Sequence, residues 1–204
     1  MKKKYKILFI VLLFVFILLL ICVKSGIAQN IDNNIYETIK NWQNREVTEI
    51  LKMITNLGGT IGLFGIALVT ILVLFFCQKR KEGIGVALNL MISSITYFVL
   101  KNIIQRPRPP IHERLIEETA YSFPSGHSTN NMAFYALAIC LVYQNVKNKK
   151  LRNVICILLV MFPILIGFSR FYLRVHYLSD VLAGFCLGIM CVIVFMSYGY
   201  PKIK

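Results

Sequence analysis

The sequence predicts an all-α integral membrane protein, a bundle of six transmembrane helices, and two observations lead to this fold class. Hydrophobic residues make up 57% of the 204 residues, whereas only 16% are charged. A water-soluble domain of this length has too little interior to bury so much apolar surface. The apolar residues also gather in runs that approach the roughly 20 residues a helix needs to cross a bilayer.

Six apolar runs divide the chain, and the fifth is short and contains Pro163. A proline is tolerated in a membrane helix because neighbouring helices can satisfy the carbonyl group that it frees. Asn89, Asn130 and Asn131 lie within runs, and we expect them to face other helices and not lipid. The predicted spans are 7–23, 59–77, 84–100, 128–143, 154–168 and 181–198.

The first run, 7–23, has two interpretations. It follows several lysines and precedes Ser25-Gly26-Ile27-Ala28, a stretch that looks like the cleavage site of a secretory signal peptide. The apolar core of a signal peptide usually has about 7–15 residues, and this run is longer. We therefore expect a membrane anchor that is retained.

The distribution of charge predicts the orientation of the bundle. The net charge is +14, but the basic residues lie in short groups between apolar runs and not on one polar domain, which argues against a nucleic-acid partner. With six spans, the side that holds both termini carries thirteen of the 23 basic residues and one of the nine acidic residues. The positive-inside rule places that side in the cytoplasm. The segments 24–58, 101–127 and 169–180 then face outward.

The outward segment 24–58, between the first and second spans, is expected to form an amphipathic extracytoplasmic helix. Its apolar residues recur at roughly helical spacing, with charged residues between them. Such a helix can lie on the outer membrane surface or pack over the bundle as a lid, and both alternatives stay open. The apolar residues concerned are Ile35, Ile39, Trp42, Ile50 and Ile54.

Polar residues suited to phosphoryl chemistry gather in the outward loops of the second half. His176 and Asp180 are four residues apart, so a helical turn places them on one face. A carboxylate bonded to one ring nitrogen of a histidine fixes its tautomer and leaves the other nitrogen basic, which suits a nucleophile or general base. Ser125 and Gly126 open the fourth span, where the free N–H groups and the helix dipole favour an anion.

Cations and a second histidine complete this set. Lys101, Arg108 and Arg170 supply cationic donors, and a guanidinium group matches the geometry of a phosphate. His127 lies beside the end of a span. A single cation at such a place usually just reaches the lipid headgroups. The combination on one membrane face, and not any single member, therefore predicts phosphoryl chemistry.

Three further residues of these loops lie outside the set. His112 belongs to no motif, and we expect it to have a capping or solvated role. Arg106 and Arg174 are expected either to bind lipid headgroups or to flank the site. None of the three is given a catalytic role.

The three groups, in this order, resemble the tripartite signature of the type 2 phosphatidic acid phosphatase superfamily. They read K-x-x-x-x-x-x-R-P from Lys101, P-S-G-H ending at His127, and S-R-x5-H-x3-D ending at Asp180. The resemblance implies one integral membrane phosphatase domain over 1–204, with the signature within 101–180. The short chain looks most like bacterial lipid phosphatases acting on phosphatidylglycerophosphate or on undecaprenyl pyrophosphate, a cell-wall lipid carrier.

The resemblance also implies a mechanism through a phosphohistidine. His176 attacks phosphorus, Asp180 orients His176, and His127 protonates the leaving lipid oxygen and then activates water. No metal ion and no other cofactor is implied, because the cations take over the electrostatic role of a metal. The implied ligands of the phosphoryl oxygens are Lys101, Arg108, Ser125, Gly126 and Arg170.

Three functions remain open at this point. We favour a lipid phosphatase whose substrate is undecaprenyl pyrophosphate, phosphatidylglycerophosphate or phosphatidate. A lipid phosphotransferase would use the same phosphohistidine and differ only in its acceptor. A non-catalytic lipid-binding membrane protein is disfavoured by the intact His127, His176 and Asp180. The expected partners are a lipid phosphate and the membrane itself.

Overall fold

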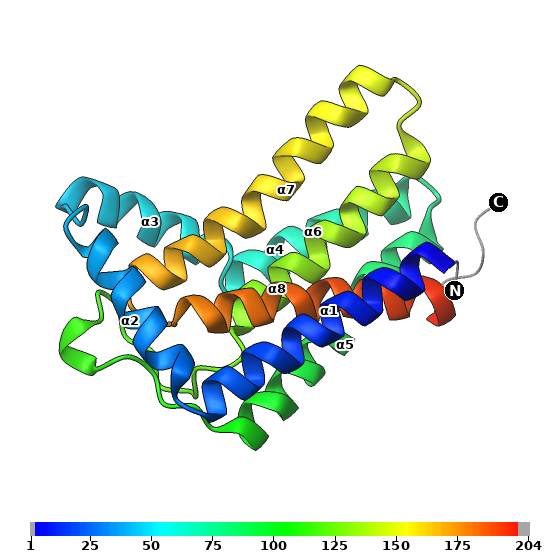
Figure 1. Ribbon diagram of the computed structural model, residues 1–204. Helices are drawn as coiled ribbons and strands as arrows, with labels where there is room; N and C mark the ends of the chain where they lie inside the picture. The colour runs from blue at the N-terminus through cyan, green and yellow to red at the C-terminus, as the bar shows by residue number, and fades with distance from the viewer. Residues whose placement is uncertain (1–2, 200–204) are drawn as a thin grey trace.

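The computed structural model describes residues 3–199, and every regular element among them is helical, which confirms the all-α class (Figure 1). A short 3-10 helix, Ile111–Glu113, lies in the loop after α5, and a π-helical turn, Phe195–Gly199, follows α8. The eight α-helices are α1 (Lys3–Lys24), α2 (Ile27–Lys40), α3 (Arg45–Leu57), α4 (Thr60–Phe76), α5 (Arg80–Ile104), α6 (Gly126–Asn145), α7 (Lys149–Tyr172) and α8 (Leu178–Val194).

Each of the six predicted spans overlaps one α-helix: α1, α4, α5, α6, α7 or α8. By length and composition, α1, α5, α7 and the continuous stretch Leu178–Ser197 can each cross a membrane alone. A fifth span results if α3 and α4, which meet at a bend of 50°, are counted together. α4 alone has only 17 residues, and the first two turns of α6 are polar. The number of six spans therefore stays a prediction.

The segment 24–58 forms two helices, so our prediction of a single amphipathic helix is wrong. Asn44 starts α3 as its N-cap, because its Oδ1 accepts a hydrogen bond from Val47 N at 2.9 Å. The chain turns between α2 and α3, and the predicted apolar residues consequently do not share one face: Ile39 is buried, whereas Trp42 is exposed. Both helices pack onto the end of α7, as Figure 1 shows, and so cover one end of the bundle.

The start of α6 is held against the start of α8 by two glycines of α8. A Cβ on Gly184 would lie 2.8 Å from Ser125 O, and a Cβ on Gly188 would lie 2.6 Å from Thr129 O. Small residues four apart allow membrane helices to approach this closely. The close approach brings the first turns of the two helices, and the polar groups they carry, to the same place.

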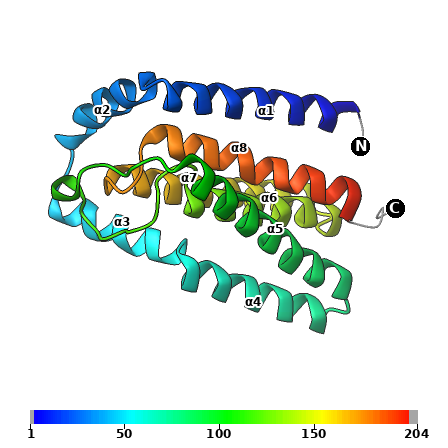
Figure 2. The same cartoon turned by 90° about the horizontal axis from the view of Figure 1, so that it is seen from below.

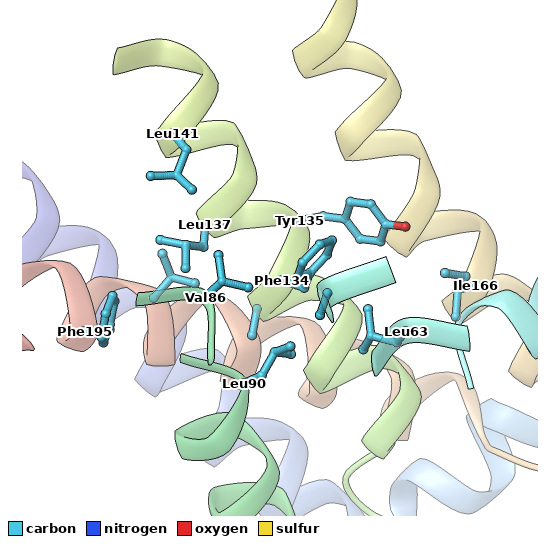
Figure 3. Packing of buried hydrophobic residues seen from close by; sticks show 12 residues of the cluster. Leu63, Val86, Leu90, Phe134, Tyr135, Leu137, Leu141, Ile166 and Phe195 are labelled. Carbon is cyan, nitrogen blue, oxygen red and sulfur yellow. The ribbon is translucent and has the colours of Figure 1, made fainter. Parts of the chain in front are cut away.

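An apolar cluster joins α6 to α4, α5 and α7 (Figure 3). α6 contributes Phe134 and Leu137, which are 4% and 1% exposed, and the cluster holds residues of these three helices and also Val192 of α8. Burying a side chain of this size stabilises a fold by about 1.5–3 kcal/mol where water is the alternative. The partners labelled in Figure 3 include Leu63 of α4, Leu90 of α5 and Ile166 of α7.

The asparagines within the spans face other helices, which confirms the expectation. Asn89 Nδ2 donates to Ala133 O of α6 at 3.0 Å, and Asn130 forms hydrogen bonds with serines of α5. Asn131 Nδ2 donates to Gly58 O at 2.7 Å, which ties α6 to the bend between α3 and α4. These bonds satisfy polar groups that would otherwise be costly in lipid.

The start of α1 and the end of α8 lie at the same end of the bundle, with the α4–α5 and α6–α7 connections (Figures 1 and 2). These two connections carry the basic groups on which the orientation was predicted. Lys2, Lys202 and Lys204 also entered that charge count but lie outside the described residues. The opposite end of the bundle carries α2, α3 and the loops that follow α5 and α7.

Candidate active site

The three sequence groups meet in one pocket at the end of the bundle covered by α2 and α3. Lys101 comes from the last turn of α5 and Arg108 from the loop that follows. His127 lies in the first turn of α6, and His176 lies between α7 and α8. All four line a pocket of about 530 Å³, whose other walls include the bend between α3 and α4. Residues far apart in the sequence are thus brought within reach of one ligand.

His176 is buried, with its two ring nitrogens facing different partners. Nδ1 lies 3.4 Å from Asp180 Oδ2, and Nε2 lies 3.2 Å from Nη1 of Arg108. Because arginine can only donate, we assign the ring proton to Nδ1 and the lone pair to Nε2. Burial, and then the positive charges of Arg108, Lys101 and Arg170, lower the pKa of His176 well below its ordinary value. The ring is therefore neutral at physiological pH, with its basic nitrogen toward the pocket.

Asp180 is held in place through both of its carboxylate oxygens. It lies in the first turn of α8, where Tyr177 N donates to Oδ2 at 2.9 Å. Ser122 Oγ donates to the same oxygen, and Arg106 Nη1 donates to Oδ1 at 2.6 Å. A carboxylate in the first turn of a helix is also stabilised by the helix dipole. These bonds fix the carboxylate that faces Nδ1 of His176.

Two of the three predicted phosphate-binding cations line the pocket directly. Lys101 is 7% exposed, and its ammonium group forms no hydrogen bond within residues 3–199. Arg108 Nη1 donates to Val175 O at 2.7 Å, which orients its guanidinium group beside His176. Burial lowers the pKa of Arg108 to about 10, so the side chain is still protonated at neutral pH. Both groups can therefore meet an anion as cations.

Glu118, which the sequence did not single out, bridges two of the predicted phosphate ligands. Its Oε2 accepts from Arg108 Nη2 at 3.3 Å, and its Oε1 accepts from Arg170 Nη2. Arg170 is 1% exposed, and its other Nη donates to Thr55 Oγ1 of α3 at 2.9 Å. Glu118 also lines the pocket, so a carboxylate bound to both guanidinium groups forms part of its wall.

The first turn of α6 places the remaining predicted residues. Ser125 is fully buried and caps the helix, since its Oγ accepts from Ser128 N at 3.3 Å and from Ser128 Oγ at 3.0 Å. Gly126 lines the pocket, and a Cβ at that position would lie 2.8 Å from the ring of Tyr97. Ser125 N donates to Asp180 O at 3.1 Å, which joins the two helix starts. The roles of Ser125 and Gly126 toward phosphate stay predictions.

Arg106 and Arg174, for which the sequence left headgroup binding open, are buried in the protein, whereas His112 is exposed. Arg106 is 6% exposed and forms ion pairs with Asp180 and Asp32. Arg174 is 2% exposed, and its Nε donates to Glu113 at 2.8 Å. Neither arginine is available to a headgroup at the surface.

The involvement of Asp32 in this end of the bundle was missed, although the sequence held one signal of it. Asp32 shares a helical face with Ala28, Tyr36 and Ile39, and all four are buried. A carboxylate on the apolar face of a helix is seldom buried without a partner. By contrast, no periodicity or motif marks Glu118 or the other residues between Pro109 and Pro124.

Comparisons with known proteins bear on the family. The model of the PAP2 superfamily matches residues 82–204. Phosphatidylglycerophosphatase B of Bacillus subtilis is 32% identical over 191 residues, which is 93% of each chain. An undecaprenyl-diphosphatase of Sulfolobus acidocaldarius is 31% identical over 125 residues, or 59% of this chain and 56% of that one. The crystal structure of a transmembrane PAP2 type phosphatidylglycerolphosphate phosphatase from Bacillus subtilis matches with a TM-score of 0.86 and 28% identity, over 96% of this chain and 98% of that one.

Proposed function

The chain belongs to the PAP2 superfamily and is a multi-pass membrane lipid phosphatase, and we propose that it hydrolyses phosphatidylglycerophosphate or undecaprenyl pyrophosphate through a phosphohistidine on His176. The observation that carries this proposal is the position of His176 Nε2, which faces a pocket lined by cations. We further propose that residues 1–204 act as one domain, because α1 packs against α8 and α2 packs against α7. Phosphatidate remains a third candidate substrate.

The proposed first step is the attack of His176 Nε2 on phosphorus. A P–N bond forms, and the bond from phosphorus to the lipid oxygen breaks. The electron pair of that bond goes to the leaving oxygen, which takes a proton from the protonated form of His127. Burial and then the charge of Arg170 lower the pKa of His127 well below its ordinary value, so the proposed step requires the bound phosphate anion to stabilise that protonated form. Nδ1 keeps its proton, and the positive charge that develops on the ring is stabilised by Asp180 at 3.4 Å. Lys101, Arg108 and Arg170 stabilise the phosphoryl oxygens.

In the proposed second step, water attacks the phosphohistidine. His127, now unprotonated, takes a proton from the water molecule, and the P–N bond breaks as inorganic phosphate leaves. His127 is thereby ready for another cycle, and His176 returns to its neutral form. His127 thus serves as the general acid of the first step and as the general base of the second.

The lining of the pocket supports a lipid as the substrate. Besides the two histidines, it contains apolar side chains of α4 and α5 that include Leu63, Phe64 and Phe98. Phe64 and Phe98 are 44% and 62% exposed, so these two rings reach the surface of helices that we propose to span the membrane. An apolar chain can therefore stay among the helices while its phosphate lies against the cations.

Release of inorganic phosphate by the purified protein in detergent tests the proposed substrate class. The panel contains phosphatidylglycerophosphate, undecaprenyl pyrophosphate, phosphatidate and a water-soluble phosphomonoester. We expect the highest kcat/KM for one of the first two substrates. Equal kcat/KM for the soluble ester and all three lipids would contradict a role of the apolar side chains of the pocket in binding the substrate.

Removal of divalent metal ions is predicted to leave the activity unchanged. Lysine and arginine neutralise the phosphate in the proposed mechanism, and Asp180 is the one carboxylate of the three sequence groups. The measurement is phosphate release before and after treatment with excess EDTA. A loss of activity that added magnesium restores would contradict a mechanism without metal.

We propose six spans, with both termini in the cytoplasm and the pocket outside, and this orientation predicts which cysteines react in intact cells. A Glu117→Cys variant should react with an impermeant thiol reagent, because residue 117 is exposed in the loop beside the pocket. Cys77 is exposed at the end of α4 and serves as the control for the opposite side. It should react only after the membrane is permeabilised, and Cys77→Ser should abolish that signal.

A cytoplasmic reporter fused after Lys204 should likewise be active. In this orientation the enzyme takes its substrate from the outer leaflet, where undecaprenyl pyrophosphate is left after cell-wall polymers are assembled. Labelling of Glu117→Cys only after permeabilisation would invert the orientation and favour a substrate of the inner leaflet.

A further inference from the structure

A buried carboxylate of α2 is bound to the first turn of α8. Asp32 is 2% exposed, and its Oδ1 accepts from Ser179 N at 3.0 Å. Its Oδ2 accepts from Ser179 Oγ at 2.5 Å and from Arg106 Nη2 at 2.9 Å. The residue beside Ser179 is Asp180. A helix from the first half of the chain thus contacts the turn that carries the carboxylate partner of His176.

Arg106 connects the two carboxylates. Its Nη2 bonds to Asp32, while its Nη1 donates to Asp180 Oδ1 at 2.6 Å and to Ser179 Oγ at 2.7 Å. The guanidinium group is 6% exposed and lies 4.1 Å from the centre of the Tyr177 ring. A guanidinium group is a rigid planar fork, so fixing one of its nitrogens also fixes the direction of the other.

The two oxygens of Asp180 have different neighbours, and Arg106 keeps them distinct. Oδ2 accepts from Tyr177 N and Ser122 Oγ and faces His176 Nδ1, whereas Arg106 is the donor to Oδ1 within the described residues. If Arg106 moved, the carboxylate would lose the bond that sets its rotation. Without Asp32, the Nη2 group of Arg106 would retain only Gln29 Oε1, at 3.4 Å.

We propose that Asp32 and Arg106 are positioning residues of the active site: Asp32 holds Arg106, Arg106 sets the rotation of Asp180, and Asp180 orients His176. This inference rests on the proposed role of His176 as nucleophile. It makes α2 a necessary part of the catalytic apparatus, in addition to its place over the end of the bundle. The alternative is that the same ion pairs only anchor α2 to α8.

The test begins with Asp32→Asn, which preserves the size of the side chain and an acceptor for Ser179 N. We expect kcat to fall by between about 10-fold and 100-fold, because small displacements of a catalytic group cost that much, while KM changes by less than about twofold. Glu37→Gln is the matched control, since Glu37 lies on the same helix, is exposed and, among residues 3–199, pairs only with Lys40. It should leave kcat unchanged.

Breaking a buried ion pair also destabilises the fold, so a loss of kcat in Asp32→Asn alone does not prove a positioning role. The same substitution in an Asp180→Asn variant distinguishes a positioning role of Asp32 from an anchoring role. In an Asp180→Asn background, Asp32→Asn should change kcat by less than about twofold, since residues that act through one another are not additive. The same loss of kcat in both backgrounds would overturn the inference. If Asp32→Asn does not fold, Ser179→Ala removes only the hydroxyl between Asp32 and Arg106 and should still lower kcat.

The activity of the wild-type protein distinguishes a failure of the positioning role of Asp32 and Arg106 from a failure of the proposed function. If it releases phosphate and Asp32→Asn and Ser179→Ala both do so with unchanged kcat, only the role of Asp32 and Arg106 is overturned. If the wild type releases phosphate from no lipid of the panel, the proposed function falls, and the inference falls with it.

Discussion

Replacing His176 by alanine is expected to lower kcat by about four orders of magnitude or more while the protein remains folded and inserted in the membrane. Nε2 of His176 is the proposed nucleophile: it lies 3.2 Å from Nη1 of Arg108, and Nδ1 of the same ring faces the fixed carboxylate of Asp180. Without that nitrogen, water would have to attack phosphorus directly. Phosphate release from the preferred lipid, measured on purified protein, gives the size of the loss.

The matched control for this variant is His112→Ala. His112 lies in the loop that follows α5, is exposed and belongs to no part of the pocket. Its removal should leave kcat unchanged, so the pair separates the loss of a nucleophile from a general effect of removing a histidine. If His176→Ala keeps more than a few per cent of the wild-type kcat, the role assigned to His176 is wrong.

Replacing His127 by alanine is expected to lower kcat for a lipid substrate by about 10²–10⁴-fold, the usual contribution of a general acid or base. The size of the loss should depend on the leaving group. A lipid alkoxide needs a proton as it leaves, whereas p-nitrophenolate leaves readily without one. The first step with p-nitrophenyl phosphate should therefore be nearly normal, and the second step, which needs a base, should be slow.

Stopped-flow measurement of p-nitrophenol release separates these steps. For His127→Ala we expect a burst that approaches one equivalent of p-nitrophenol per enzyme, followed by slow turnover, because the phosphohistidine accumulates. A loss of equal size for the lipid and for p-nitrophenyl phosphate, without a burst, would mean that His127 does not act as the acid and base.

The sequence predicted the positions of the long helices well because apolar runs and membrane helices follow the same length rule. Their boundaries were predicted less well. The fifth span was placed at 154–168, whereas α7 runs from Lys149 to Tyr172. Lys149, Lys150 and Arg152 were assigned to a loop because they are charged, but a helix can continue beyond the apolar layer, where such side chains reach water.

The amphipathic segment shows a different limit. Periodicity over 24–58 correctly indicated helix, but it did not reveal the turn that separates α2 from α3, which Asn44 starts. Asn44 is a good N-cap residue, and this signal competed with the spacing of the isoleucines. The apolar periodicity of 24–58 also could not decide between a surface helix and a lid. That choice depends on contacts of this segment with α7 and α8, which the sequence pattern does not show.

The signature residues could be found from the sequence because they are grouped, whereas their supporting residues could not. Lys101, His127 and His176 line one pocket, as the three groups suggested. The positions of Asp32 and Glu118 depend on how loops and helices meet: Asp32 pairs with Arg106, 74 residues away in the chain, and Glu118 pairs with Arg170, 52 residues away. Only the fold brings such side chains together.

The proposed mechanism requires a phosphohistidine on His176, and this covalent intermediate can be trapped. The His127→Ala variant is mixed with p-nitrophenyl phosphate labelled with ³²P, from which the first step does not need the proton of His127, then quenched at alkaline pH, at which phosphohistidine is stable, and digested. We expect an acid-labile label on the peptide that contains His176, and no label on the same peptide from a variant that also carries His176→Ala. A label on another residue, or none while the variant still releases phosphate, would contradict the proposed mechanism.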